Sequence, residues 1–420
     1  MISAQEREYL RTLAARQREL AESDRNRELE KRWTAHNALQ KGEPLAVIET
    51  ETFWNEICPP LRCTDPDARA IEERILFHLV PAELIGDDRM VPAAHRVPLQ
   101  VQVEEFGIKK EKQTSSDASS AAYQYKHPLQ DLETDLDLLK PSTFSHNLSA
   151  ARAQADLAED IFGDILPVEI ENQSLLWHVM PTQKVVDLMG MENYFMSMYD
   201  TPDELHQLMR FITDDLIRCI RWEEEEGILT PNWADHYAGS SNFGYTSLLP
   251  ASEKKNIDLR RGKTDIKMRD LWLNINSQES VGISREMFEE FVLPYYKELC
   301  AQAGLVYYGC CEPVHGIFTG GLDQIGNIRK LSISAWCDEA SIAEQLKGKN
   351  IIYSRKPSAN FLGVGEQLDE DAFRAYMQKT MDLTRNLNVE VIFRDVYTLS
   401  GNTGKLKTAL RILRECAAKR

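Results

Sequence analysis

The chain has 420 residues, enough for one large barrel-type domain or two ordinary domains. Its 66 acidic residues outnumber its 49 basic residues and give a net charge of −17, which disfavours binding to nucleic acids or to anionic membranes. No apolar run reaches the ~18 residues of a membrane span, and the charged N-terminus differs from a secretory signal. The eight cysteines are scattered apart from one adjacent pair, so we expect free thiols in a cytoplasmic protein.

The first part of the chain predicts a helical arm. Residues 3–38 are rich in Glu, Arg, Leu and Ala and contain no helix breaker. Apolar residues recur there at roughly helical spacing, namely at Leu10, Leu13, Leu20, Leu29 and Trp33. This pattern predicts an arm over residues 1–40 that precedes a domain over residues 41–420. The apolar run at 45–48 then predicts a short buried strand.

The middle of the chain predicts an insertion, and the rest predicts alternating helices and strands. Residues 107–126 are polar, serine-rich and aperiodic, which is typical of an inserted loop. One predicted helix begins at Thr201 and ends at Gly227, and another begins at Ser284 and ends at Gly304. A short apolar run follows each helix, and three more come later, in LSISAWCD, NIIYSRKP and VEVIFRDV. Such alternation predicts a parallel sheet with crossover helices.

Side chains capable of chemistry fall at the predicted carboxyl ends of these strands. They are Glu49 and Glu51, Asp235 and His236, Asn274 and Gln278, Cys310 to Glu312, Cys337 and Asp338, Lys356, and Asp395. In a (β/α)8 barrel this edge of the sheet forms the active-site face. The predicted fold is therefore an α/β (β/α)8 TIM barrel with a helical N-terminal arm, and we expect these side chains to line one pocket.

Three segments also resemble a known family. NINSQESVGISREMFEEFVLPYYKEL, YYGCCEPVHG and VEVIFRDVYT are similar to the second half of the uroporphyrinogen decarboxylase superfamily, in particular to its decarboxylase-like corrinoid-dependent methyltransferases of the O-demethylase type. The resemblance extends over residues 160–415 and more loosely over 45–54. It implies a barrel that moves a methyl group between a small methylated substrate and the cobalt of cobalamin on a partner corrinoid protein, in anaerobic metabolism.

Uroporphyrinogen decarboxylation itself is disfavoured. The family resemblance implies an arginine-rich N-terminal segment that holds the carboxylates of the porphyrinogen. Only Arg62 and Arg69 lie near the exit of the first predicted strand. The net charge of −17 also opposes a multiply anionic tetrapyrrole.

The resemblance also implies a zinc site, with two alternatives. The thiol-alkylating relatives use a His-x-Cys pair and a later cysteine, and this sequence has Tyr308 and Cys310 at the pair. Zinc ligands could come from the set Cys310, Cys311, Glu312, His315 and Cys337. The relatives that act on aryl ethers imply a Glu, Glu, His set, whose spacing is reproduced by Asp200, Asp215 and His236. The first set is favoured, with Cys310, Cys311 and Cys337 as the expected ligands, and inert buried thiols are the alternative.

The leading hypothesis is a methyltransferase that passes a methyl group from a small methylated compound, with an aryl methyl ether favoured, to cob(I)alamin on a partner protein. Because cobalt(I) is already a strong nucleophile, the enzyme must activate the leaving group by protonation or by a Lewis acid. The expected catalytic residues are His236, Glu312 and Asp395, with the first two as proton donors in one pocket. The expected substrate-binding residues are Glu49, Asp235, Asn274, Gln278, Tyr308 and Lys356.

Two alternatives stay open. One is a barrel decarboxylase or lyase that acts on a small carboxylic acid without a corrinoid. The other is a non-catalytic barrel that binds a tetrapyrrole or a corrinoid partner. We expect no nucleic-acid or membrane partner, and formation of a homodimer stays open.

Overall fold

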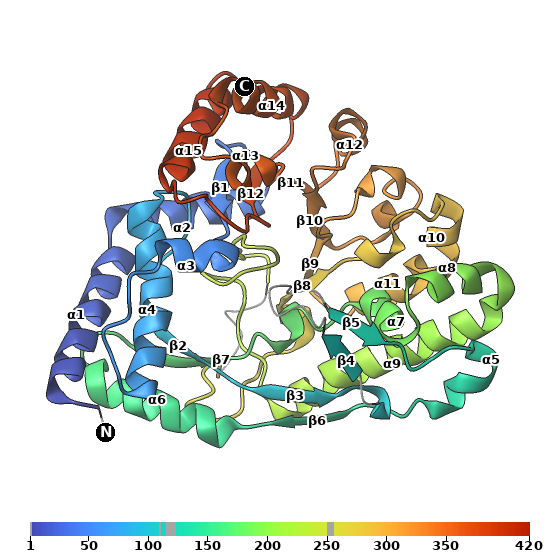
Figure 1. Ribbon diagram of the computed structural model, residues 1–420, viewed down its shortest axis with the longest axis horizontal. Coiled ribbons are helices and arrows are strands. Elements are labelled where there is room, and N and C mark those ends of the chain that lie inside the picture. Colours follow the sequence, from blue (N-terminus) through green and yellow to red (C-terminus); the bar gives the residue numbers. More distant parts are fainter. Residues whose placement is uncertain (1, 109–110, 115–122, 250–255) are drawn as a thin grey trace.

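The computed structural model describes residues 2–108, 111–114, 123–249 and 256–420, and its main element is a six-stranded parallel sheet (Figure 1). The strands follow the order β1-β12-β11-β10-β9-β8. Their bounds are β1 (Leu45–Ile48), β8 (Trp272–Ile275), β9 (Leu305–Tyr308), β10 (Ile328–Ile333), β11 (Ile352–Arg355) and β12 (Val389–Phe393). All neighbours pair in parallel. The sequence-based prediction of parallel pairing is confirmed for these strands.

A second parallel pair, β2 (His95–Pro98) with β7 (Val168–Glu171), lies apart from this sheet. Within the described ranges, no strand pairing joins this pair to β1 or to β8. Side chains make contacts at both junctions instead: Asp88 accepts a hydrogen bond from the amide of Ala46 in β1, and Asn232 exchanges two with the backbone of Trp272 in β8, each 2.9 Å long. The fold is thus mixed α/β with a parallel sheet, and closure into an eight-stranded barrel stays a prediction.

Helices cover the outer face of the sheet and surround the β2–β7 pair (Figure 1). Around the six strands lie α10 (Arg285–Phe291), α11 (Leu293–Cys300), α12 (Glu339–Gln345), α14 (Glu370–Leu383) and α15 (Gly404–Ala417). Beside β2 and β7 lie α1 (Ala4–Ala21), α4 (Pro66–Leu84) and α6 (Leu148–Phe162). The remaining helices are α2 (Asp24–Asn37), α3 (Trp54–Ile57), α5 (Leu132–Asp135), α7 (Pro181–Met189), α8 (Met191–Asp200), α9 (Pro202–Glu226) and α13 (Asn360–Gly363). No helix of the described ranges has the length and apolar character that crossing a bilayer requires.

Two of the predicted helices are divided in the structure, and a third ends where it was predicted to end. The predicted arm is two helices, because Ser23 ends the first segment and caps α2 by accepting a hydrogen bond from the amide of Asn26. The helix predicted from Ser284 divides into α10 and α11 at Val292, just before Pro294. The helix α9 ends as predicted, with Gly227 in the left-handed region at φ 65°.

Two predictions about irregular and extended segments are wrong. The run before Asp235 forms no strand, because Pro231 lacks an amide donor and the side chains of Thr230 and Asn232 bond to neighbouring backbone in place of a ladder. Part of the predicted loop at 107–126 is instead an antiparallel pair, β4 (Glu111–Thr114) with β5 (Tyr123–Lys126). Residues 109–110 and 115–122 of that prediction lie outside the described ranges. A further antiparallel pair joins β3 (Val101–Glu104) to β6 (Thr143–His146).

The inner face of the six-stranded sheet carries a buried ion pair. Lys330 of β10 donates to Glu390 of β12 at 2.9 Å, and neither side chain is exposed to solvent. Ser354 of β11 donates to the other carboxylate oxygen at 2.7 Å, and His36 of α2 lies 3.2 Å from the first. Burial opposes ionisation, but Lys330 and His36 outweigh it and lower the pKa of Glu390 to about 2. This group of side chains therefore ties three strands to the N-terminal arm.

Replacing Lys330 by methionine should cost about 3 to 5 kcal/mol of unfolding free energy, because it leaves the Glu390 carboxylate buried without its partner. Urea unfolding followed by circular dichroism would measure the loss. The matched control is Lys347→Met, since Lys347 and its partner Glu344 are both exposed, and we expect little change there. Equal stability of Lys330→Met and the wild type would contradict a central role for the buried pair.

Candidate functional site

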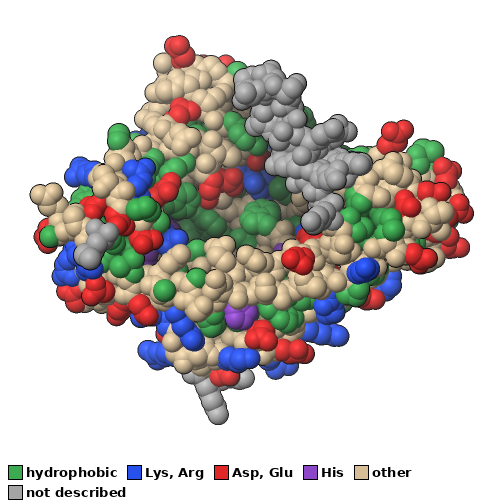
Figure 2. Space-filling model, turned by 60° about the horizontal axis from the view of Figure 1, so that its bottom comes forward, with side chains coloured by type: hydrophobic (Ala, Val, Ile, Leu, Met, Phe, Trp, Pro, Cys, Tyr) green, Lys and Arg blue, Asp and Glu red, His purple; other side chains and the backbone are tan. Residues whose placement is uncertain are grey.

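A cavity of about 260 Å³ lies between α4, β2, the end of β7 and the irregular segment 235–243. Its apolar wall consists of Phe77, Met90, Pro92, Pro98, Leu176 and Phe243. Its polar lining consists of Arg74, His78, Arg89, Arg96, Glu171, Gln173, Asp235, His236 and Tyr237. Figure 2 shows a hollow on one face of the molecule, in which hydrophobic, basic and acidic side chains lie. An apolar wall with a few convergent polar groups is typical of a site for a small molecule.

Three arginines line this cavity, and two of them are neutralised by aspartates. The Nε atom of Arg89 donates to Asp87 at 2.8 Å, and Arg96 donates to Asp235 at 2.5 Å. Arg74 has no hydrogen bond or ion pair with any described residue, and burial lowers its pKa despite the field of a nearby glutamate. The sequence-based prediction named only Arg62 and Arg69 and did not identify these three arginines.

His236 and Glu171 form the titratable pair of the cavity. The Nε2 atom of His236 lies 3.8 Å from Glu171, and its Nδ1 atom lies 3.6 Å from Asp235 and has no hydrogen-bond partner. Burial, together with Arg96, lowers the pKa of His236 to about 3, so the ring is neutral at pH 7. Burial raises the pKa of Glu171 despite the charge of Arg96. Burial therefore favours a proton on the carboxyl group and disfavours a cationic imidazole.

Glu312 lies in a different place from His236. It is 2% exposed, and its two carboxylate oxygens accept hydrogen bonds from the amides of Ser277 at 3.0 Å and Cys310 at 2.8 Å. It lines a separate cavity of about 280 Å³ beside His315, near the ends of β8 and β9. The structure therefore does not bring Glu312 and His236 into one cavity, and Glu312 joins the two strand ends through its hydrogen bonds.

A strand-end cluster of Glu49, Ser240, Ser241, Cys310 and Arg394 lies at the carboxyl ends of β1, β9 and β12. Arg394 donates to Ser240 at 2.6 Å and to the sulfur of Cys310 at 3.4 Å, and its Nε atom lies 3.4 Å from Glu49. Ser241 donates to the same carboxylate at 3.0 Å. Glu49 and Cys310 therefore both contact Arg394, a residue that the sequence-based prediction did not include.

The expected zinc ligands are not assembled. The sulfur atoms of Cys310 and Cys311 lie 3.6 Å apart, and Cys311 donates to Asp395 at 3.5 Å. The sulfur of Cys337 instead accepts the amide of Val314 at 3.3 Å. Within the described part of the chain, no group of three or more His, Cys, Asp or Glu side chains is arranged to hold a metal ion. The donor set predicted from Cys310, Cys311 and Cys337 therefore does not fit zinc as these side chains stand.

The alternative zinc set of Asp200, Asp215 and His236, all within the described ranges, is not arranged to hold a metal ion either. Asp215 lies in the middle of α9 and accepts a hydrogen bond from the amide of Ser142 at 3.0 Å. Its carboxylate also pairs with Arg218, one turn along the helix. These contacts give Asp215 a structural role.

The other predicted substrate-binding residues are dispersed. Lys356 follows β11 and donates to the hydroxyl of Tyr307 and to Ser332, the latter at 2.7 Å. Asn274 of β8 donates to the carbonyl of Leu176 at 2.8 Å and leaves its own oxygen without a partner. Gln278 begins a short turn after β8.

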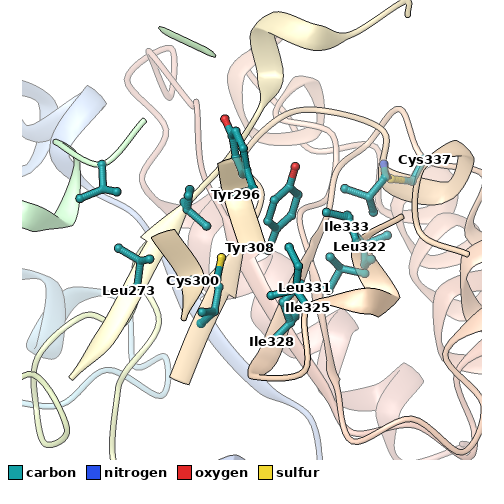
Figure 3. Close-up of a cluster of buried hydrophobic side chains, with 14 of the residues drawn as sticks. Leu273, Tyr296, Cys300, Tyr308, Leu322, Ile325, Ile328, Leu331, Ile333 and Cys337 are labelled. Atoms are coloured by element: carbon teal, nitrogen blue, oxygen red, sulfur yellow. Dashed lines mark hydrogen bonds between the residues drawn. The ribbon is translucent and has the colours of Figure 1, made fainter. Parts of the chain in front are cut away.

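Tyr308 lies on the other face of the sheet from the cavity. It is fully buried in the core between the sheet and the helices, beside Tyr296 and Cys300 (Figure 3). Its hydroxyl group lies 2.5 Å from that of Ser277. The neighbouring Tyr307 points to the inner face and meets Lys356. Successive strand residues point to opposite faces, so Tyr307, and not Tyr308, takes the inward position.

The sequence analysis missed the residues that line most of the cavity. Arg74 and His78 stand four positions apart on α4, and Arg96, Glu171 and Gln173 lie on or just after β2 and β7. The signal for Glu171 was the alternation in VEIE at 168–171, which is typical of a half-buried strand. The signal for the arginines was weaker, because a polar helix face gives the same sequence pattern whether it faces solvent or a cavity.

Comparison with known proteins leaves the family open. No protein-family model matches the sequence, and no curated protein matches it. Among solved structures, a methyltransferase from Methanosarcina mazei is similar, with 14% sequence identity and a TM-score of 0.49. The similarity covers 92% of this chain and 98% of that chain. An identity and an overlap of this size assign neither a family nor an activity.

The burial of His236 makes a prediction about acid stability. Because the pKa of its ring falls from 6.5 in the unfolded chain to about 3 in the folded protein, protonation favours the unfolded chain. The unfolding free energy is therefore not reduced by His236 above pH 6.5, and it decreases as the pH falls from 6.5 toward 3. Between pH 6.5 and 4.5, the wild type should lose roughly 2 to 3 kcal/mol more unfolding free energy than His236→Gln.

Urea unfolding of both proteins at each pH would measure this difference. Proton NMR of the His236 ring in the folded protein should show no titration down to pH 5. A ring that titrates near 6.5, or identical pH slopes in both proteins, would contradict the buried neutral imidazole.

Proposed function

We propose that this chain transfers a methyl group from a small methylated compound, an aryl methyl ether, to cob(I)alamin carried by a partner corrinoid protein. The observation that supports the donor half is the cavity, with its apolar wall and its Glu171–His236 pair. The acceptor half rests on the resemblance of residues 274–299, 307–316 and 389–398 to corrinoid-dependent methyltransferases.

The apolar wall would hold an aromatic ring and exclude water from it. Phe77, Leu176 and Phe243 contribute this surface from three different segments of the chain. A dry site strengthens every hydrogen bond and charge contact that the substrate makes there. Shape and exclusion of water are therefore the tasks of these side chains.

The polar side would assist the departure of the phenolate. Cobalt(I) supplies the electron pair that takes the methyl group, and the bond between the methyl carbon and the ether oxygen breaks. Glu171, whose pKa burial raises, would give its proton to the departing oxygen, which leaves as a neutral phenol. Neutral His236, 3.8 Å away, would orient the carboxyl group. Glu171 is favoured over Glu312 for this role because both oxygens of Glu312 already bind backbone amides.

A lyase that acts on a small carboxylic acid is the second candidate. The observation that favours it is Arg74, a cation without an ion-pair partner among the described residues, at the same cavity. Such a lyase would release carbon dioxide without any corrinoid, which separates the two candidates.

The reaction can be tested by mixing the protein with a reduced corrinoid protein and a panel of methoxylated aromatics. The cobalt(I) absorbance should decay, and the corresponding phenol should form, only when the chain, the corrinoid protein and a methoxyarene are all present. Heat-treated protein is the control. Release of carbon dioxide from an aromatic acid in the absence of the corrinoid protein would favour the lyase instead.

Removing the proton donor should matter most for a poor leaving group. Glu171→Gln should lower turnover of an unactivated methoxyarene by about 10²- to 10⁴-fold, the usual contribution of a general acid. The loss should be much smaller for a nitro-substituted ether, whose phenol is strongly acidic. The matched control is Glu192→Gln on α8, because this side chain is exposed and does not line the cavity.

Equal losses of turnover on both ethers would remove Glu171 from the role of proton donor. The same comparison with Glu312→Gln tests the assignment made from the sequence. A leaving-group dependence in Glu312→Gln and none in Glu171→Gln would reverse the preference stated above.

A further inference from the structure

Glu223 is a buried acid outside the candidate cavity. It lies in the last turn of α9, and its side chain is shielded from solvent. Its two carboxylate oxygens accept hydrogen bonds from the side chains of Asn172 and Ser174, each 2.7 Å long. Both donors belong to the segment 172–176 that follows the end of β7, the β7 loop. The carboxyl group of Glu223 therefore binds this loop directly.

The β7 loop also forms part of the wall of the candidate cavity, to which it contributes Gln173 and Leu176. A separate cavity of about 20 Å³ lies between the loop, the segment 229–232 and β8, and it has room for about one water molecule. The loop itself is partly exposed. A displacement of this loop would therefore hydrate Glu223 and change the cavity wall together.

No positive charge balances Glu223 among the described residues. Its pKa is set by burial and by the two hydrogen bonds from neutral donors. Cys219, one turn earlier on α9, is the titratable side chain on which its charge acts, and burial raises the pKa of that thiol, which is therefore neutral. Other charged groups around this part of α9 have partners of their own: Lys184 with Glu105, Arg218 with Asp215, Lys267 with the carbonyl of Glu224, and His146 with Glu226.

Burial couples the position of the β7 loop to the protonation of Glu223. Burial outweighs the two hydrogen bonds and raises the pKa of this carboxyl group from 4.5 to about 7. A displaced loop would let water reach the group and return its pKa toward 4.5. Between these two pH values, the protein with a closed loop then binds more protons than the protein with an open loop. A rise in pH therefore favours opening, and a fall favours closure.

We propose that the β7 loop is a pH-sensitive gate of the cavity, which closes over Glu223 when this carboxyl group is protonated and opens when the group ionises. Gln173 and Leu176 move with the loop, so the cavity is complete in the closed form. The inference goes beyond the proposed function, because it concerns access to the cavity whatever compound the cavity holds.

Hydrogen–deuterium exchange followed by mass spectrometry tests the gate. The amides of Asn172, Ser174 and Leu176 donate hydrogen bonds in the closed loop, so their exchange reports its opening. After correction for the intrinsic rate at each pH, this exchange should be about 5- to 20-fold faster at pH 7.5 than at pH 5.5, and the upper value applies if the pKa returns fully to 4.5. Glu223→Gln, which is neutral throughout, should exchange at both pH values as the wild type does at pH 5.5.

The matched control is Glu225→Gln, which removes the same charge from an exposed position on the same helix and should keep the pH dependence of the wild type. The amides of the fully buried strand β12 serve as an internal reference. Ser174→Ala removes a hydrogen bond that favours the ionised carboxylate, so it should move the midpoint of opening to a higher pH. This shift supplies the test if Glu223→Gln does not fold.

The gate is overturned if the corrected exchange of the loop rises less than about fivefold, if it slows as the pH rises, or if Glu223→Gln keeps the dependence of the wild type. An equal pH dependence in β12 would overturn it too, because it would show a change of the whole protein. A loop that opens as expected in a protein that transfers no methyl group would keep this inference and remove the proposed function.

Discussion

Lys330 and Glu390 place opposite charges, neither of them exposed, at the middle of the inner face of the sheet. Such a burial costs several kcal/mol per charge unless the charges pair and their other hydrogen-bonding groups are satisfied. Here Ser354 donates to the carboxylate, the ammonium group donates to the carbonyl of Phe243, and it lies 5.1 Å from the ring centre of Trp33. These partners come from β11, from the irregular segment 235–243 and from α2. One charge pair therefore constrains the strands, the segment and the arm together.

The position of the cavity depends on this constraint. Phe243 is one of its walls, and the segment that ends there also carries Asp235 and His236 to the end of β7. The segment must run close to the sheet, since a Cβ atom on Gly239 would come within 2.4 Å of the Tyr307 ring. Only glycine permits that approach. The backbone of segment 235–243 therefore connects the buried Lys330–Glu390 pair to His236 in the cavity.

The strands of the large sheet could be predicted from the sequence. So could the location of several polar side chains at the carboxyl ends of these strands. Buried parallel strands read as continuous apolar runs, and their carboxyl ends meet at one edge, so Glu49, Cys310 and Asp395 were placed correctly at that edge. The sequence could not show which of these side chains already have hydrogen-bond partners within the protein. Both oxygens of Glu312 bind backbone amides, and this depends on how two loops fold back. Arg74 was missed because helical periodicity does not show what a polar face meets.

Burial acts in opposite directions on the two titratable groups of the cavity. Burial shifts the pKa of His236 down and the pKa of Glu171 up, because it disfavours whichever form is charged. With the Arg96–Asp235 pair neutral overall, the main unbalanced charge near Glu171 is that of Arg74, which favours the ionised carboxylate. Burial therefore raises the pKa of Glu171, whereas the charges of Arg96 and Arg74 lower it, so the protonation of this carboxyl group depends on how completely water is excluded from the cavity.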